Sequence, residues 1–269
     1  MAVGTINMTI LIINVKLINQ TMSTETYLKI NKISALLHNW LKTQTSRESL
    51  TWLEDKQAEI RGNGGEKSLF IAFSQASRYL EKQKLELSTE KLQAADNIIT
   101  GWNPSNWTIN QVGRTWLILS FPHEDKYKYL ATLDKIFAAA DVREAIALYQ
   151  SLPLLPHPEE FKLRAAEGIR SNITSVFNAI ALFNPYPAQY LDDLAWNQMV
   201  LKALFVSSPL VAIYGLKQRN NEQLSQMLID YARERLAAKR EVNSQLWQLA
   251  APFKPQAVAS LEAAFKSVI

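Results

Sequence analysis

The chain has 269 residues, of which 48% are hydrophobic and 20% charged. These values are typical of a folded globular protein and exclude an intrinsically disordered one. The net charge is +4, but Lys and Arg alternate with Asp and Glu, so we expect no nucleic-acid partner. Cysteine is absent, which excludes disulfides and thiolate chemistry. The three histidines, His38, His123 and His157, match no metal-binding spacing, so we expect no metal and no cofactor.

Residues 1–21 differ in composition from the rest of the chain. They are rich in Ile, Thr and Asn, and they lack the basic start and small-residue cleavage site of a secretory signal. A signal is one interpretation. We prefer a disordered or over-extended leader, with Met22 as the working start and residues 22–269 as a single all-helical domain.

A second apolar segment, residues 199–216, is long enough to suggest a membrane span. Lys202 and Pro209 interrupt it, and proline ends a helix by removing a backbone donor. We therefore expect two short buried helices here and a soluble protein.

Helix starts are marked by local capping signals. Apolar residues at helical spacing predict a first helix over residues 27–41. Ser88 is expected to cap another helix, and Pro122 to open one that runs to about residue 140. Three capping boxes predict further starts: Thr45 with Glu48, Thr108 with Gln111, and Asp141 with Glu144.

Two features between these helices need interpretation. The glycine-rich segment 62–65 is predicted to be a turn, because no strand precedes it and no Gly-Lys-Ser follows. The proline-rich segment 152–158 could be a linker or a packed turn, and its leucines favour the packed turn.

Arg114 lies in an almost continuously apolar helix, so we expect it to be buried with a carboxylate or several carbonyl partners.

The segment from residue 159 to 205 is the most polar of the apolar-rich segments. It predicts one helix through residues 164–180, a corner at Asn184-Pro-Tyr-Pro187, and a second helix through residues 194–205. The polar side of the first helix is expected to be mainly solvated, with Arg164 paired to Glu167. In the second helix Asn197 falls among apolar residues that include Leu194, so it needs a structural partner, such as the corner, or a pocket.

Three more helices complete the chain, begun by Asn221, Asn243 and Pro255. The predicted fold is all-α, with about a dozen helices stacked as hairpins in a solenoid-like or bundle arrangement and no significant sheet.

Several long strings of the sequence resemble the EboA family. They are AFSQASRYL, GWNPSNWT, ALYQSLPLLP, LPLLPHPEEF, RAAEGIRSNITSVFNAIALFNPYP, LAWNQMVLKALF and IDYARERLAAKR. The resemblance spans about residues 36–253, without the leader. It implies a role in moving secondary-metabolite precursors from cytoplasm to periplasm in bacteria, cyanobacteria among them. It also implies a cytoplasmic location, with peripheral attachment to the inner membrane as an alternative, and partners from the same gene cluster, including a prenyltransferase-like membrane protein. It carries over no catalytic residues.

Two classes of function follow. The first is a non-enzymatic protein that binds a hydrophobic or prenylated small molecule or partner proteins. Its pocket would be lined by Trp102, Asn103, Asn172, Tyr186 and Asn197.

The second class is an enzyme acting on a lipid-linked or prenylated intermediate. Glu167 would act as acid–base, and Arg78, Arg114 or Arg170 would hold an anionic group. The Asp192-Asp193 pair resembles a diphosphate-binding motif but has no third aspartate at helical spacing and no second acidic motif, which weakens a terpene-type enzyme.

Overall fold

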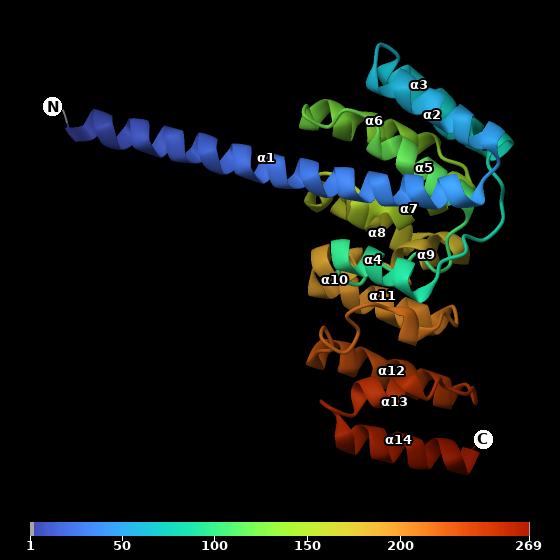
Figure 1. Cartoon of the computed structure of the whole chain (residues 1–269). Coiled ribbons are helices and arrows are strands. Elements are labelled where there is room, and N and C mark those ends of the chain that lie inside the picture. The colour runs from blue at the N-terminus through green and yellow to red at the C-terminus, as the bar shows by residue number, and fades with distance from the viewer. Residues whose placement is uncertain (1–2, 269) are drawn as a thin grey trace. The chain divides into compact units, whose positions relative to one another are not determined.

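The computed structural model describes the backbone of residues 3–268 and the side chains of residues 24–266. Within that part the protein is all-α, as predicted, with no strand and one isolated bridge between Lys84 and Thr108. The disordered or over-extended leader was predicted for residues 1–21, whose side chains all lie outside the described part. It stays a prediction. The α-helices are α1 (Val3–Gln44), α2 (Arg47–Arg61), α3 (Gly65–Tyr79), α4 (Thr89–Ile98), α5 (Ile109–Leu119), α6 (Lys126–Ala139), α7 (Val142–Ser151), α8 (Lys162–Arg170), α9 (Thr174–Ala181), α10 (Tyr186–Tyr190), α11 (Asp193–Phe205), α12 (Glu222–Ala237), α13 (Gln245–Ala250) and α14 (Pro255–Val268) (Figure 1).

The chain forms two compact units. Unit 1 comprises residues 1–99, 105–138 and 154–157, and unit 2 comprises residues 100–104, 139–153 and 158–269. The single domain expected over residues 22–269 stays a prediction, and each unit is described by itself.

Unit 1 is built around α5. Ten of its eleven residues are buried, and it packs against α1, α2 and α3. Arg114 is buried in this helix as predicted, and its partners include the Ser77 hydroxyl, which accepts a hydrogen bond at 3.0 Å, and the ring of Phe73, whose centroid lies 4.9 Å from the guanidinium carbon. A hydroxyl and an aromatic ring are therefore among the groups that stabilise this cation. The predicted carboxylate or carbonyl partners stay a prediction.

Unit 1 also contains α4 and all of α6 except its last residue, and unit 2 contains α7 to α14. Helix α9 packs against α7 and α8, α11 packs against α12, and α12, α13 and α14 pack on one another (Figure 1).

The leucines of segment 152–158 are buried, so this segment is a packed turn, as predicted. Two short 3₁₀ helices, Leu152–Leu154 and Pro158–Phe161, lie in and beside it, and a third spans Leu210–Ala212.

Two capping boxes are present as predicted and the third is wrong. Both reciprocal hydrogen bonds form at the starts of α5 and α7. At the start of α2, however, the cap is Ser46, whose hydroxyl accepts from the Ser49 amide at 3.1 Å. Thr45 instead donates to the Glu81 carboxylate at 2.7 Å, a contact from a distant part of the chain.

Three other predicted helices have different bounds. Helix α6 begins at Lys126 and not at Pro122, because Asp125 caps it by accepting from the Lys128 amide at 3.0 Å. The single helix expected through residues 164–180 is two helices, α8 and α9. The expected helix after Pro209 is only the 3₁₀ turn Leu210–Ala212.

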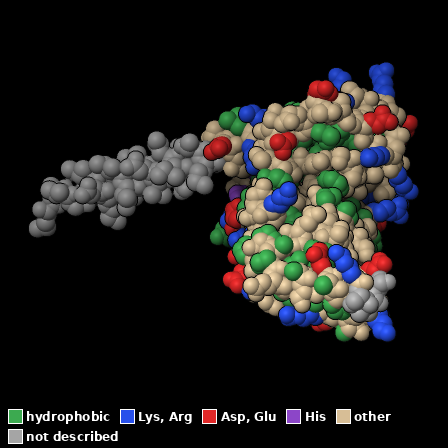
Figure 2. Space-filling view, turned by 90° about the horizontal axis from the view of Figure 1, so that it is seen from below, with side chains coloured by type: hydrophobic (Ala, Val, Ile, Leu, Met, Phe, Trp, Pro, Cys, Tyr) green, Lys and Arg blue, Asp and Glu red, His purple; other side chains and the backbone are tan. Residues whose placement is uncertain are grey.

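The apolar segment 199–216 is interrupted, as predicted. Helix α11 ends at Phe205, and among the described residues no helix is long and apolar enough to cross a membrane. Figure 2 shows hydrophobic, basic and acidic side chains interspersed on the face that it displays.

Candidate functional site

Lys202 organises the break between α8 and α9. Its ammonium group donates to the carbonyls of Ile169 and Ser171, at 2.5 Å and 2.7 Å, and lies 5.1 Å from the ring centroid of Phe177. These carbonyls belong to the end of α8, where backbone acceptors have no partner within the helix. The break leaves Ile173 exposed.

The predicted corner is held by Asn184. This buried side chain donates to the carbonyls of Tyr149 and Ala179, at 3.0 Å and 3.1 Å, and accepts from the Tyr186 amide at 2.9 Å. The Tyr186 hydroxyl donates to the Pro158 carbonyl at 2.6 Å, and burial raises the pKa of this hydroxyl. Tyr186 is completely buried, so it is placed here as part of the core.

Asn197 is also completely buried, and its partner is Asn221. The two side-chain amides exchange hydrogen bonds at 3.2 Å and 2.9 Å. Asn221 caps α12 with the same side chain, accepting from the Leu224 amide at 2.8 Å. Of the two alternatives for Asn197, the structure shows the structural partner, although this partner is not the corner. Leu194, expected on the same apolar face, is 56% exposed.

Arg219 was missed by the sequence reasoning. Its guanidinium donates to the carbonyls of Pro187 and Leu191, at 3.1 Å and 2.9 Å, and to the Asp193 carboxylate at 2.6 Å. It also lies over the ring of Trp196 at 4.8 Å. These contacts come from residues 23 or more positions away, so no local pattern could have identified them.

The Asp192-Asp193 pair is therefore used structurally. Asp192 caps α11 by accepting from the Ala195 amide at 2.8 Å, and Asp193 pairs with Arg219.

The other candidates in unit 2 differ in exposure and in their partners. Glu167 forms the predicted pair with Arg164 at 2.8 Å, and Arg170 and Asn172 are exposed. Trp102 is buried, and the backbone N–H of Asn103 donates to the Phe183 carbonyl at 3.3 Å. Arg78 and Arg114 belong to unit 1, where Arg78 is exposed.

The largest of the cavities described in unit 2 is a groove of about 740 Å³ between segment 210–220 and α13, here called the groove. Its apolar lining consists of Leu210, Val211, Ile213, Leu216, Leu249 and Pro252. Its polar lining consists of Lys217, Gln218, Asn220, Gln245 and Gln248. The Tyr214 ring, which also lines it, packs against Gly101, whose φ is +86°. This volume and mixture of side chains are typical of small-molecule sites.

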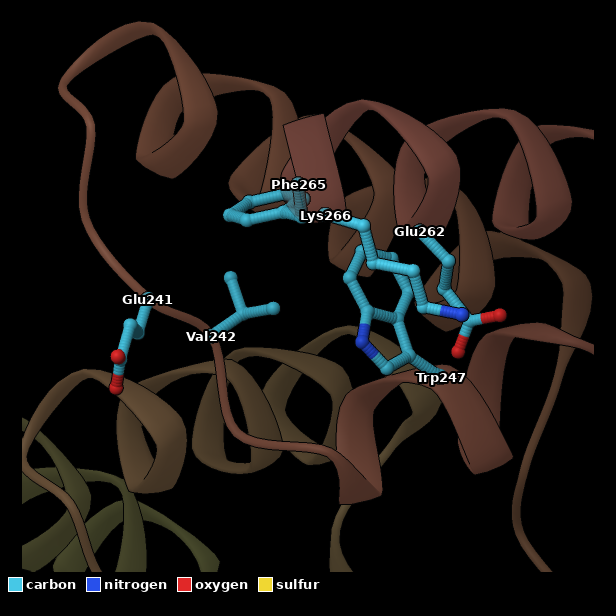
Figure 3. A pocket seen from close by; sticks show the side chains of 6 residues that line it. All are labelled: Glu241, Val242, Trp247, Glu262, Phe265 and Lys266. Atoms are coloured by element: carbon cyan, nitrogen blue, oxygen red, sulfur yellow. The ribbon is translucent and has the colours of Figure 1, made fainter. Parts of the chain in front are cut away.

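A second, smaller cavity of about 350 Å³ lies between α13 and α14, here called the aromatic cleft. Figure 3 shows Val242, Trp247 and Phe265 around it, with the Glu241 carboxylate turned away. The rings of Trp247 and Phe265 meet edge to face, with centroids 5.7 Å apart. Helix α13 separates the two cavities, since Gln245, Gln248 and Leu249 line the groove and Trp247 lines the aromatic cleft.

Comparison with known proteins decides the family. The model of the family described as "Metabolite traffic protein EboA" matches residues 33–251. The chain belongs to the EboA family. Searches of the curated proteins and of the solved structures found no match.

The EboA match covers the groove almost entirely but ends before α14. All groove residues except Pro252 lie within it, whereas Glu262, Phe265 and Lys266 of the aromatic cleft lie beyond it. The groove is therefore the better candidate for a site that belongs to the family's role.

Proposed function

We propose that the chain is a non-enzymatic accessory protein of metabolite traffic that binds a hydrophobic small molecule in the groove. In this role it assists the passage of a secondary-metabolite precursor from the cytoplasm to the periplasm. A prenyltransferase-like membrane protein of the same gene cluster is the partner that we propose for delivery.

The observation that carries this proposal is the groove itself. Six of its lining residues are apolar, and its volume lies within the roughly 300–1,000 Å³ of small-molecule pockets. Three of its polar side chains are the amides of Gln218, Gln245 and Gln248, which can orient a ligand by hydrogen bonding without reacting with it. Such a lining suits reversible binding of an apolar molecule.

An enzyme centred on Glu167 has less support. The carboxylate is half-exposed and ion-paired with Arg164 on one surface of α8, and neither of the two cavities described in unit 2 contains it. A general acid–base needs a site that holds its substrate within hydrogen-bonding distance.

The test uses the fluorescent apolar probe N-phenyl-1-naphthylamine with the full chain. Two exposed apolar residues of unit 2 offer a matched pair: Val211 lines the groove, Leu163 of α8 does not, and each is 79% exposed. Because both are so exposed, Val211→Asp and Leu163→Asp should each change the stability of the fold by less than about 0.5 kcal/mol.

We expect Val211→Asp to weaken probe binding by about tenfold or more, because a carboxylate must lose water when an apolar molecule covers it. Leu163→Asp should bind like the unmodified chain. Equal affinities of the two variants, or no fluorescence enhancement with the unmodified chain, would contradict the proposal.

A further inference from the structure

The charge of the groove comes from one side chain. Of the described residues that line it, Lys217 alone is charged at neutral pH, and no carboxylate lines it. The Lys217 side chain is exposed and forms no ion pair in the described part of the chain. It is therefore available to a bound molecule.

The neighbouring cations are already neutralised. Arg219, two residues after Lys217, pairs with Asp193 at 2.6 Å. Lys254, two residues after Pro252 at the other wall, pairs with Glu222 at 2.8 Å. The positive charge of the groove is thus concentrated at one unpaired ammonium group beside an apolar surface.

We infer that the ligand of the groove is an amphiphile with an anionic end, a carboxylate or a phosphate, attached to an apolar body. This inference rests on the proposed function and adds the charge of the ligand to it. Lys217 holds the anionic end, and the amides of Gln218, Gln245 and Gln248 are further donors in the lining of the same groove. A cationic amphiphile finds no counter-charge in the groove, so its charged end must stay in water.

The experiment compares molecules with one alkyl chain and different ends. Decanoate, decyl phosphate, decanol and decylamine, each below its micelle concentration, compete with N-phenyl-1-naphthylamine for the full chain. We expect decanoate and decyl phosphate to bind about fivefold more tightly than decanol, the gain typical of an exposed charge pair. Decylamine should bind more weakly than decanol.

Variants test whether the preference for anionic over neutral alkyl compounds comes from the Lys217 side chain. Lys217→Gln should remove the fivefold preference of decanoate and decyl phosphate over decanol, and Lys217→Arg should keep that preference. The matched control is Lys67→Gln, which removes one positive charge from an exposed position of α3, outside the groove. If Lys67→Gln removes the preference as fully as Lys217→Gln does, or if decanoate and decanol bind the unmodified chain equally, the inference is wrong.

The outcomes separate this inference from the proposed function. Binding of the neutral probe without any preference among the four alkyl compounds overturns only the anionic end. Failure of the probe to bind overturns both. A lipid headgroup could supply the same anion, so vesicles of phosphatidylglycerol and of phosphatidylcholine are compared by co-sedimentation. Selective sedimentation with phosphatidylglycerol that Lys217→Gln abolishes identifies a lipid as the source of the anion, whereas decanoate binding without sedimentation identifies a free amphiphile.

Discussion

The amide pair between Asn197 and Asn221 gives the sharpest stability prediction. Asn197→Ala removes two hydrogen bonds, each worth about 1 kcal/mol net, and leaves a small cavity at a completely buried position. Asn221 keeps two other partners, the Leu224 amide and the Arg219 carbonyl, so it is not left unsatisfied. We expect a loss of about 2–3 kcal/mol in the free energy of unfolding.

A double-mutant cycle isolates the pair. Asn221→Ser retains a hydroxyl that can cap α12 but cannot complete the amide pair. The double variant should lose about 1.5–2 kcal/mol less than the sum of the two single variants, because the same hydrogen bonds are removed only once. Asn172→Ala, at an exposed position, is the matched control and should cost less than about 0.5 kcal/mol.

The assay is guanidinium unfolding followed by circular dichroism and by tryptophan fluorescence. Coincident transitions are the condition for deriving a free energy, because a chain with two compact units can unfold in steps. Additive losses in the double variant, or a loss below about 0.5 kcal/mol for Asn197→Ala, would refute the reasoning. Ligand binding that survives in Asn197→Ala would confirm that this amide is structural.

Three further predictions concern positions that stabilise the inside of one unit or the other: Lys202 and Gly101 in unit 2, and Glu66 in unit 1. Lys202→Met should cost about 2 kcal/mol and accelerate amide exchange in residues 162–173, because the end of α8 loses its ammonium donor. Gly101→Ala should cost at least about 2 kcal/mol and weaken probe binding in the groove, since its φ is +86° and a Cβ would lie 2.3 Å from the Tyr214 ring. In unit 1 the hydrogen bond from Lys135 lowers the pKa of Glu66, so this carboxylate stabilises the fold above its unfolded pKa and the contribution is lost as the pH falls from about 5 towards 3. Glu66→Gln should accordingly show a smaller drop in melting temperature than the unmodified chain over that range; an equal drop would contradict the assignment.

What the sequence predicted well was encoded within a few residues. The capping boxes at Thr108 and Asp141 form because both partners lie three residues apart. The burial of Arg114 followed from its apolar neighbours along one helix.

What the sequence missed depends on contacts across the chain. The interruption between α8 and α9 is stabilised by Lys202, more than 30 residues later, so periodicity alone favoured one continuous helix. The partner of Asn197 lies 24 residues away, and the groove joins two segments that no motif connects. Local patterns therefore predicted the helices better than the candidate site.

Helix α13 has only six residues, and an isolated helix of that length is not stable in water. Its persistence depends on what packs on either side, and two cavities replace part of that packing. If a molecule binds in the groove as proposed, it supplies the missing contacts, and we expect occupancy to lower the rate at which residues 245–250 open to solvent. Hydrogen exchange of residues 245–250 would then report whether the proposed ligand occupies the groove.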